Sequence, residues 1–169
     1  MRFIGISELS EADGAHAVLQ QAIPTGLIDV VMLTINLFLQ TAIDSVLPLC
    51  TQFDVGTVVM MPLNQASHIS GLVSREAALE CLRRHVSAGT LPAEAPYTDP
   101  AVLKVLDPYP VPEISLRFVL AQQISTCCVG MQSPERLRDN LRAVDPPYVY
   151  PERLQQIKDL FGRIQQQVR

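Results

Sequence analysis

The residues best suited to chemistry lie in the stretch TCCVGMQSPERLRDN, at positions 126–140. The tripeptide Ser-Pro-Glu that begins at Ser133 is typical of a helix start, because serine caps free N–H groups, proline suits the first helical position and a carboxylate favours the positive end of the helix dipole. Free N–H groups at a helix start attract anions, and Arg136 and Arg138 add donors suited to a phosphate. The pattern predicts an anion site, with an ordinary capped helix as the competing interpretation.

The first half of this stretch is a compact apolar run that ends at Gly130 and is typical of a buried strand. The same alternation of strand and helix runs through the chain, which indicates βαβ units in an α/β fold. We expect strands at 2–7, 28–34, 56–60 and 126–130, the second of them covered on both faces. We expect a loop and the start of a helix at 8–14, with this helix continuing to 22. Further helices are expected at 42–53, 74–86, from 112 onward, 134–144 and about 151–168. A proline-rich irregular connection fills about 87–110, with a helical turn at 101–106.

Length and composition restrict the class of protein. With 169 residues and 48% hydrophobic content the chain can bury one core, whereas a complete eight-stranded barrel needs about 250 residues. A net charge of −4 without a Lys/Arg cluster argues against a nucleic-acid surface. The longest apolar run contains Asp29 and is too short to span a bilayer, so we expect no membrane association and a soluble, cytoplasmic chain.

The cysteines and histidines do not indicate a metal site or a nucleophile site. The four cysteines form no CxxC pair and have no zinc or iron–sulfur spacing, so we expect reduced, buried thiols. The adjacent Cys127 and Cys128 would point to opposite faces of a strand. The three histidines, His16, His68 and His85, are scattered without a nucleophile nearby, and we expect them at the surface or in loops.

Four short motifs, in order along the chain, resemble the second half of the aldo/keto reductase barrel. RFIGISEL resembles the fifth strand of that family, GLIDVVMLTINLF the sixth, GTVVMMPLN the seventh, and STCCVGMQSPERLRDN the eighth strand with its helix. The resemblance implies half of a TIM-type (β/α)8 barrel, with four parallel strands, outer helices and the C-terminal helix. It covers residues 1–169 as a single domain.

The resemblance also implies the cofactor NADP(H) and the residues that bind it. Arg136 falls on the arginine that pairs with the adenosine 2′-phosphate, and Asn140 on the asparagine that contacts adenine. Ser7 falls on the serine that contacts the nicotinamide carboxamide, and Asp139 takes the place of an acidic residue. With the strand end and the helix cap, the expected cofactor-binding set is Ser7, Gly130, Ser133, Arg136, Asp139 and Asn140.

Several positions depart from the family pattern. Gly130 and Met131 stand where many members carry a lysine near the strand end. Glu8 replaces the asparagine beside the carboxamide-binding serine, Met32 replaces a carboxamide-binding glutamine, and Met60 replaces a tyrosine that commonly stacks on the nicotinamide. These departures bear on the strength of binding and on the preference for NADP over NAD.

The catalytic residues of the family have no counterpart here. Its Tyr, Lys, Asp and His come from the first four strands, and carbonyl reduction needs such a proton donor for the developing alkoxide. None of the tyrosines of this chain has a nearby lysine and aspartate, so we expect them to pack and to anchor loops. They are Tyr97, Tyr109, Tyr148 and Tyr150. We assign no catalytic residue and expect the chain alone to be catalytically incomplete.

A half-barrel exposes its first and last strands as edges. It would be completed as a homodimer of halves, by a separately encoded first half, or as part of a longer protein, and the abrupt opening on a strand favours the last. The leading functional hypothesis is an NADP(H)-dependent oxidoreductase acting on carbonyl or alcohol substrates. The alternative is a non-catalytic binding or regulatory module derived from the same fold.

Overall fold

A four-stranded parallel sheet forms the centre of the protein, in the order β1-β2-β3-β4. A computed structural model describes residues 2–8, 13–64, 71–144 and 149–164. The strands are β1 (Gly5–Ser7), β2 (Val30–Thr34), β3 (Gly56–Met60) and β4 (Thr126–Cys127). Since parallel neighbours need a crossover between them, each strand is followed by helical structure. The predicted α/β fold with four parallel strands and outer helices is confirmed.

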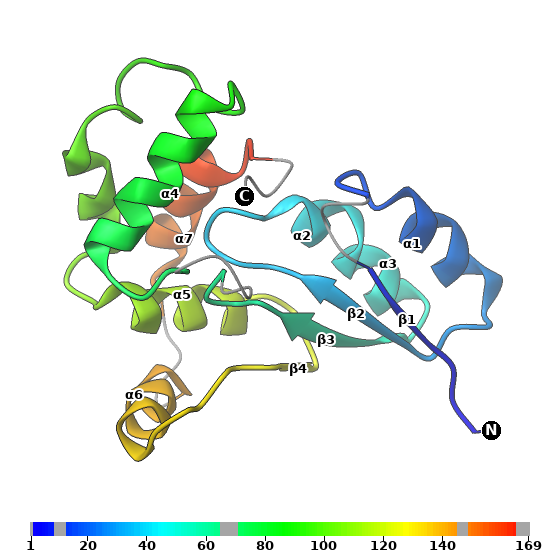
Figure 1. The fold of residues 1–169 in the computed structure, drawn as a ribbon. Coiled ribbons are helices and arrows are strands. Elements are labelled where there is room, and N and C mark those ends of the chain that lie inside the picture. The colour runs from blue at the N-terminus through cyan, green and yellow to red at the C-terminus, as the bar shows by residue number, and fades with distance from the viewer. Residues whose placement is uncertain (1, 9–12, 65–70, 145–148, 165–169) are drawn as a thin grey trace.

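The helices surround the sheet on several sides. Figure 1 shows α1, α2 and α3 along one face, and α4 and α7 on the side toward which β2 and β3 point. The helical elements are α1 (Ala17–Ala22), η1 (Ile23–Thr25), α2 (Thr41–Ser45), α3 (Leu47–Gln52), α4 (Arg75–Ser87), η2 (Pro100–Leu106), α5 (Val111–Leu120), α6 (Pro134–Val144) and α7 (Pro151–Phe161).

Two helix predictions need correction. The single helix expected at 42–53 is divided into α2 and α3, which meet at Val46. Pro48 explains the break, because proline has no N–H to donate and its ring crowds the carbonyl of Asp44 one turn earlier. The C-terminal helix ends at Phe161 instead of continuing to 168, and residues 165–169 lie outside the described part of the chain.

The connection between α4 and α5 is irregular, as predicted for about 87–110, and contains η2 where a helical turn was expected. Asp99 caps η2 by accepting a hydrogen bond from the N–H of Ala101 at 2.8 Å. Val102, Leu103 and Leu106 from η2 are buried. The connection therefore belongs to the core despite its proline content.

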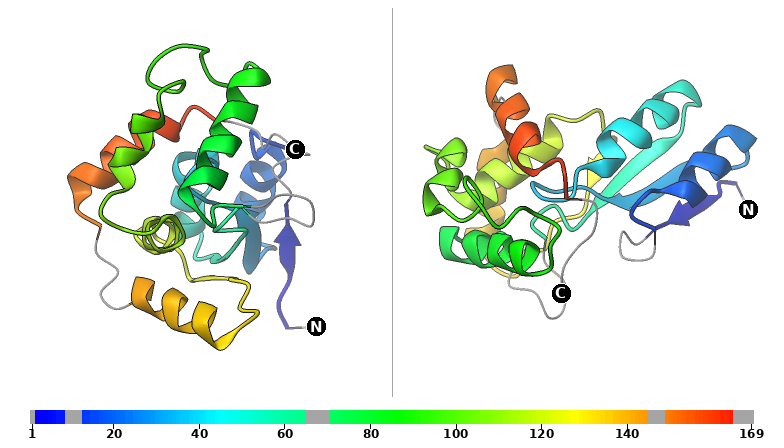
Figure 2. Two further views of the ribbon diagram at one scale, coloured as in Figure 1. Left: turned by 60° about the vertical axis from the view of Figure 1, so that its left-hand side comes forward. Right: turned by 90° about the horizontal axis from the view of Figure 1, so that it is seen from above.

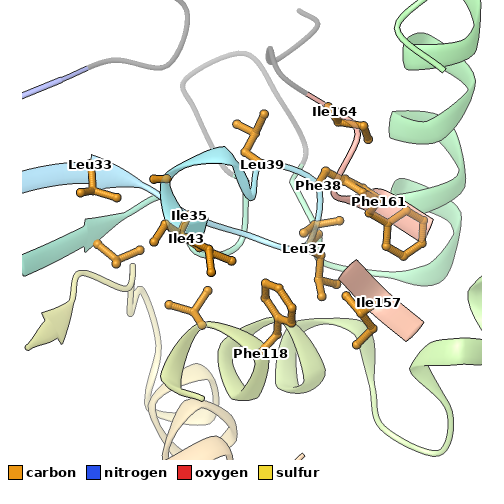
Figure 3. Close-up of a cluster of buried hydrophobic side chains, with 14 of the residues drawn as sticks. Leu33, Ile35, Leu37, Phe38, Leu39, Ile43, Phe118, Ile157, Phe161 and Ile164 are labelled. Carbon is orange, nitrogen blue, oxygen red and sulfur yellow. The ribbon is translucent and has the colours of Figure 1, made fainter. Parts of the chain in front are cut away.

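The largest side chains of the core gather where the loop after β2 meets α5 and α7 (Figure 3). Phe38 from that loop and Phe161 at the end of α7 pack edge to face, with ring centroids 5.0 Å apart. Phe118 of α5 and Ile157 of α7 are fully buried beside them. The last helix thus packs across the body of the domain.

Burial of the strands differs from the prediction. In β2, Val31 and Leu33 are buried but Val30 and Met32 are only half-buried, so this strand is not covered on both faces. β4 is short and partly exposed, so the buried strand expected at 126–130 is wrong. Both β2 and β4 are less buried than predicted for the same reason: the face that would line a barrel interior meets no further strands among the described residues. The expected exposure of the edge strands β1 and β4 is confirmed.

The cysteines and histidines show a mixed outcome. All four cysteines are free, as expected, but Cys128 is exposed because it leaves the edge strand. His16 and His85 are buried, each only 1% exposed, so the expectation of surface residues was wrong for both, and His68 lies outside the described residues. Thr90 Oγ1 lies 2.9 Å from Nδ1 of His85, and burial lowers the pKa of His85 to about 4.

No helix of the described residues is both long and apolar enough to cross a membrane.

Candidate functional site

The candidate site begins where β4 gives way to α6. Ser133 Oγ accepts a hydrogen bond from the backbone N–H of Arg136 at 3.3 Å, and Pro134 is the first residue of the helix. This is the helix start that the sequence predicted. Figure 2 shows α6 at the margin of the molecule, so its first turn is open to ligands.

Arg136 carries a positive charge that no carboxylate among the described residues compensates. Its guanidinium donates a hydrogen bond to Oε1 of Gln132 at 3.2 Å, and it makes no ion pair with any residue that the structure describes. By contrast, Arg138 and Arg142 each pair with a carboxylate of α6, at 3.7 and 3.0 Å. Of these three arginines, Arg136 is the one with a charge available to an anion at the helix start.

Asn140 presents a second free donor on the same side of α6. Its Nδ2 atom is buried and has no hydrogen-bond partner among the described residues. An unpaired buried donor costs about 1–3 kcal/mol, and a ligand acceptor would satisfy it. Arg136 and Asn140 are four residues apart on α6, which places them on one face of the helix, and Gln132 lies just before the helix start. Asp139 instead accepts from Arg142 at 3.0 Å.

The remaining predicted residues have different surroundings. Gly130 is exposed, and a Cβ placed there would meet no heavy atom within 4 Å, so packing does not require glycine. Ser7 is exposed at the carboxyl end of β1. The structure therefore gathers Ser133, Arg136 and Asn140 on α6 and places Ser7 at the opposite edge of the sheet.

Sequence reasoning missed two groups of polar residues. Gln132 holds the Arg136 side chain, and its place four residues earlier is the signal that would have found it. Glu8 and His16 form a buried polar pair near the end of β1. The signal here was the position of Glu8 directly after a strand, where side chains of α/β proteins meet ligands.

Two of the tyrosines serve in packing, as expected. The hydroxyl of Tyr97 donates to the carbonyl of Leu160 at 2.9 Å. The ring of Tyr109 lies under the guanidinium of Arg117, 5.0 Å from its centre. Within the described residues, no group of three or more His, Cys, Asp and Glu side chains is arranged to hold a metal ion.

Comparison with known proteins supports the fold. No family model matches the chain, and no curated protein matches it. Among solved structures, the apo form of aldo-keto reductase AKR11C1 from Bacillus halodurans is similar, with a TM-score of 0.59 and 21% identity over 95% of this chain and 51% of that chain. For its holo form the TM-score is 0.55, with 20% identity over 85% of this chain and 45% of that chain.

This likeness shows the fold: the chain has part of the barrel fold seen in an aldo-keto reductase. The chain spans about half the length of the solved structures it matches.

Proposed function

We propose that the start of α6 binds the 2′-phosphate and adenine end of NADP(H), and that the chain is the cofactor-binding C-terminal half of an aldo/keto reductase type oxidoreductase for carbonyl or alcohol substrates. The observation that carries the proposal is Arg136, whose unpaired charge lies beside the first-turn N–H groups of a capped helix. A phosphate needs this combination of a positive charge and several N–H donors.

The residues present fit the phosphate and adenine end of the cofactor. Ser133 fixes the helix start, Arg136 would pair with the phosphate, and Nδ2 of Asn140 would donate to a ring nitrogen of adenine. Gly130 leaves the approach open because no side chain projects from it. Asp139, paired with Arg142, would hold the far side of the helix in place. The solved structure of a holo aldo-keto reductase with this fold supports a nicotinamide cofactor.

The nicotinamide end would lie near Ser7, at the carboxyl end of β1. The cofactor supplies the hydride when it is bound, and the alkoxide that forms needs a proton donor. Tyr97 and Tyr109 are engaged in packing, away from such a role. We therefore propose that this chain binds the cofactor but does not reduce a carbonyl by itself.

Completion of the barrel would involve both edges of the sheet. Large apolar side chains are exposed near each edge: Phe3, Ile4 and Leu27 by β1, and Met131, Leu137, Leu141 and Val144 on or before α6. Such patches mark interaction surfaces. They support a partner that covers the edges, either a first half of the barrel or a second copy of this chain, and they equally favour the second candidate function, a binding module without catalysis.

The cytoplasm is the location that this proposal implies. Free thiols such as those of the four cysteines are typical of reducing compartments.

Calorimetric titration of the chain with NADPH and with 2′,5′-ADP tests the binding proposal. Arg136→Ala should weaken the binding of both ligands by roughly 10-fold to 150-fold, the equivalent of one charge-assisted hydrogen bond. Arg83→Ala is the matched control and should change binding little, because Arg83 is an exposed arginine of α4 that pairs with Glu80. Equal binding by wild type and Arg136→Ala would remove Arg136 from the site, and measurable reduction of an aldehyde by the isolated chain would contradict its catalytic incompleteness.

A further inference from the structure

Three hydrogen-bonded polar side chains lie beside Ser7, at the edge of the sheet opposite to β4 and α6. Glu8 follows β1 directly, and its N–H still donates to the carbonyl of Met32 at 2.9 Å. His16 precedes α1, and Thr41 is the first residue of α2. Two successive strand-to-helix connections thus bring the three side chains together. In (β/α)8 proteins, active sites are built from these connections.

The distances between these three side chains are those of strong hydrogen bonds. Oε2 of Glu8 lies 2.5 Å from Nδ1 of His16, and Nε2 of His16 lies 2.8 Å from Oγ1 of Thr41. Glu8 and His16 are 8% and 1% exposed, so their contact is shielded from water. His16 also has a left-handed backbone, with φ at 58°, a conformation that is uncommon for a side chain other than glycine and is concentrated at functional sites.

These distances allow one arrangement that suits catalysis. With Glu8 ionised and His16 neutral, Nδ1–H of His16 donates to Glu8, and Nε2 is left to accept from the hydroxyl of Thr41. A hydroxyl bonded to a base that a third group orients is the arrangement of an activated nucleophile.

Thr41 also lines a cavity. A cleft of about 330 Å³ between α2 and the end of α7 is lined by Gln40, Thr41, Asp44, Gln155 and Lys158, among others. Asp44 and Asp159 bring two negative charges to its wall and Lys158 one positive charge, so Lys158 is the lining side chain that would stabilise an oxyanion. Gln40 is 4% exposed, and its Oε1 atom has no hydrogen-bond partner in the described part of the chain. An acceptor left unpaired beside the cleft is a second indication that a ligand belongs there.

We propose that Thr41, His16 and Glu8 form an acyl-transfer site for small carboxylic esters that bind in this cleft. Thr41 is the nucleophile, His16 the general base, and Glu8 a positioning residue that orients the imidazole. The triad is separate from Ser133 and Arg136, which lie at the start of α6 at the other edge of the sheet, whereas Glu8 directly follows Ser7, where the nicotinamide end of the cofactor would lie.

The reaction balances without an oxidant or a reductant. Oγ1 of Thr41 attacks the ester carbonyl while Nε2 of His16 takes the hydroxyl proton. The bond between the carbonyl carbon and the alcohol oxygen breaks, and the alcohol leaves with the proton from His16. Water then attacks the acyl-threonine, with His16 again as the base, releasing the carboxylic acid and restoring the hydroxyl of Thr41.

The test uses the full chain and 4-nitrophenyl acetate, with release of 4-nitrophenol and the intact mass measured together. We expect the gain of one acetyl group, located at Thr41 by peptide mapping. Thr41→Val keeps the shape of the side chain without the hydroxyl and should lose acetylation at this position, whereas Thr41→Ser should retain it. Thr51→Val is the matched control, because the Thr51 hydroxyl bonds only to the backbone carbonyl of Leu47 in the described structure.

His16→Gln should lower the acetylation rate constant on the order of 100-fold, the usual contribution of a general base. Glu8→Gln should lower this rate constant while leaving KM for the ester unchanged, which separates positioning from a general loss of folding. The proposal is overturned if Thr41→Val is acetylated at the same rate as wild type, or if acetyl groups are found on other residues but not on Thr41 in a folded protein.

Discussion

The helices on either side of β4 have similar lengths and opposite environments. α5 is buried along most of its length, including Ile114, Phe118 and Val119. In α6, Ala143 is buried, while Leu137, Leu141 and Val144 are exposed. Both sequences carry apolar residues at helical spacing, so amphipathicity does not explain the difference. The reason is position, because α5 lies against β4 and the core while α6 lies beyond the last strand.

The largest expected effect is that of a substitution in the buried helix, α5. Phe118→Ala should lower the free energy of unfolding by about 3–5 kcal/mol, since it leaves a cavity in the core. Leu141→Ala, on the exposed side of α6, should cost less than about 0.5 kcal/mol. Urea unfolding of both variants measures the difference. A large loss for Leu141→Ala in the isolated chain would show that this face of α6 is covered.

The second prediction concerns pH and α4, which shares the buried environment of α5. Burial lowers the pKa of His85 from 6.5 to about 4. Between these values the unfolded chain binds a proton at His85 that the folded chain does not, so stability is fully present above pH 6.5 and falls as the pH is lowered toward 4. The total loss is about 3 kcal/mol.

Urea unfolding at a series of pH values tests this effect. His85→Gln should flatten the fall in stability over this window, because glutamine does not titrate. A pH dependence that is unchanged in His85→Gln would show that other groups cause it.

These contrasts also show what a sequence can reveal. The cap at Ser133 and the order of strands and helices were predictable, because both depend on neighbouring residues. The exposure of the apolar run around Cys127 was not predictable, because it depends on whether another strand lies alongside. The burial of His16 was equally hidden, because its partners Glu8 and Thr41 come from separate connections. The break at Pro48 was available in the sequence and was overlooked.

The smallest predicted effect compares two capped helix starts. Ser74 caps α4 and Ser133 caps α6, each by accepting a backbone N–H, at 3.1 and 3.3 Å. Either serine-to-alanine change should cost about 1 kcal/mol. For Ser74→Ala the loss should appear in global unfolding, because α4 is packed on the core. For Ser133→Ala it should appear as faster amide exchange confined to α6, with almost no change in the urea midpoint. Equal global effects would contradict the view that the exposed start of α6 contributes less to global stability than the start of α4.

Amide hydrogen exchange with and without 2′,5′-ADP tests the central claim most directly, because it reports where the ligand binds. The account predicts slower exchange in peptides covering 132–141, no change at the equally capped start of α4 around Ser74, and loss of the effect in Arg136→Ala. Slower exchange at both helix starts, or none at 132–141 when the ligand is saturating, would contradict a nucleotide phosphate site at the start of α6.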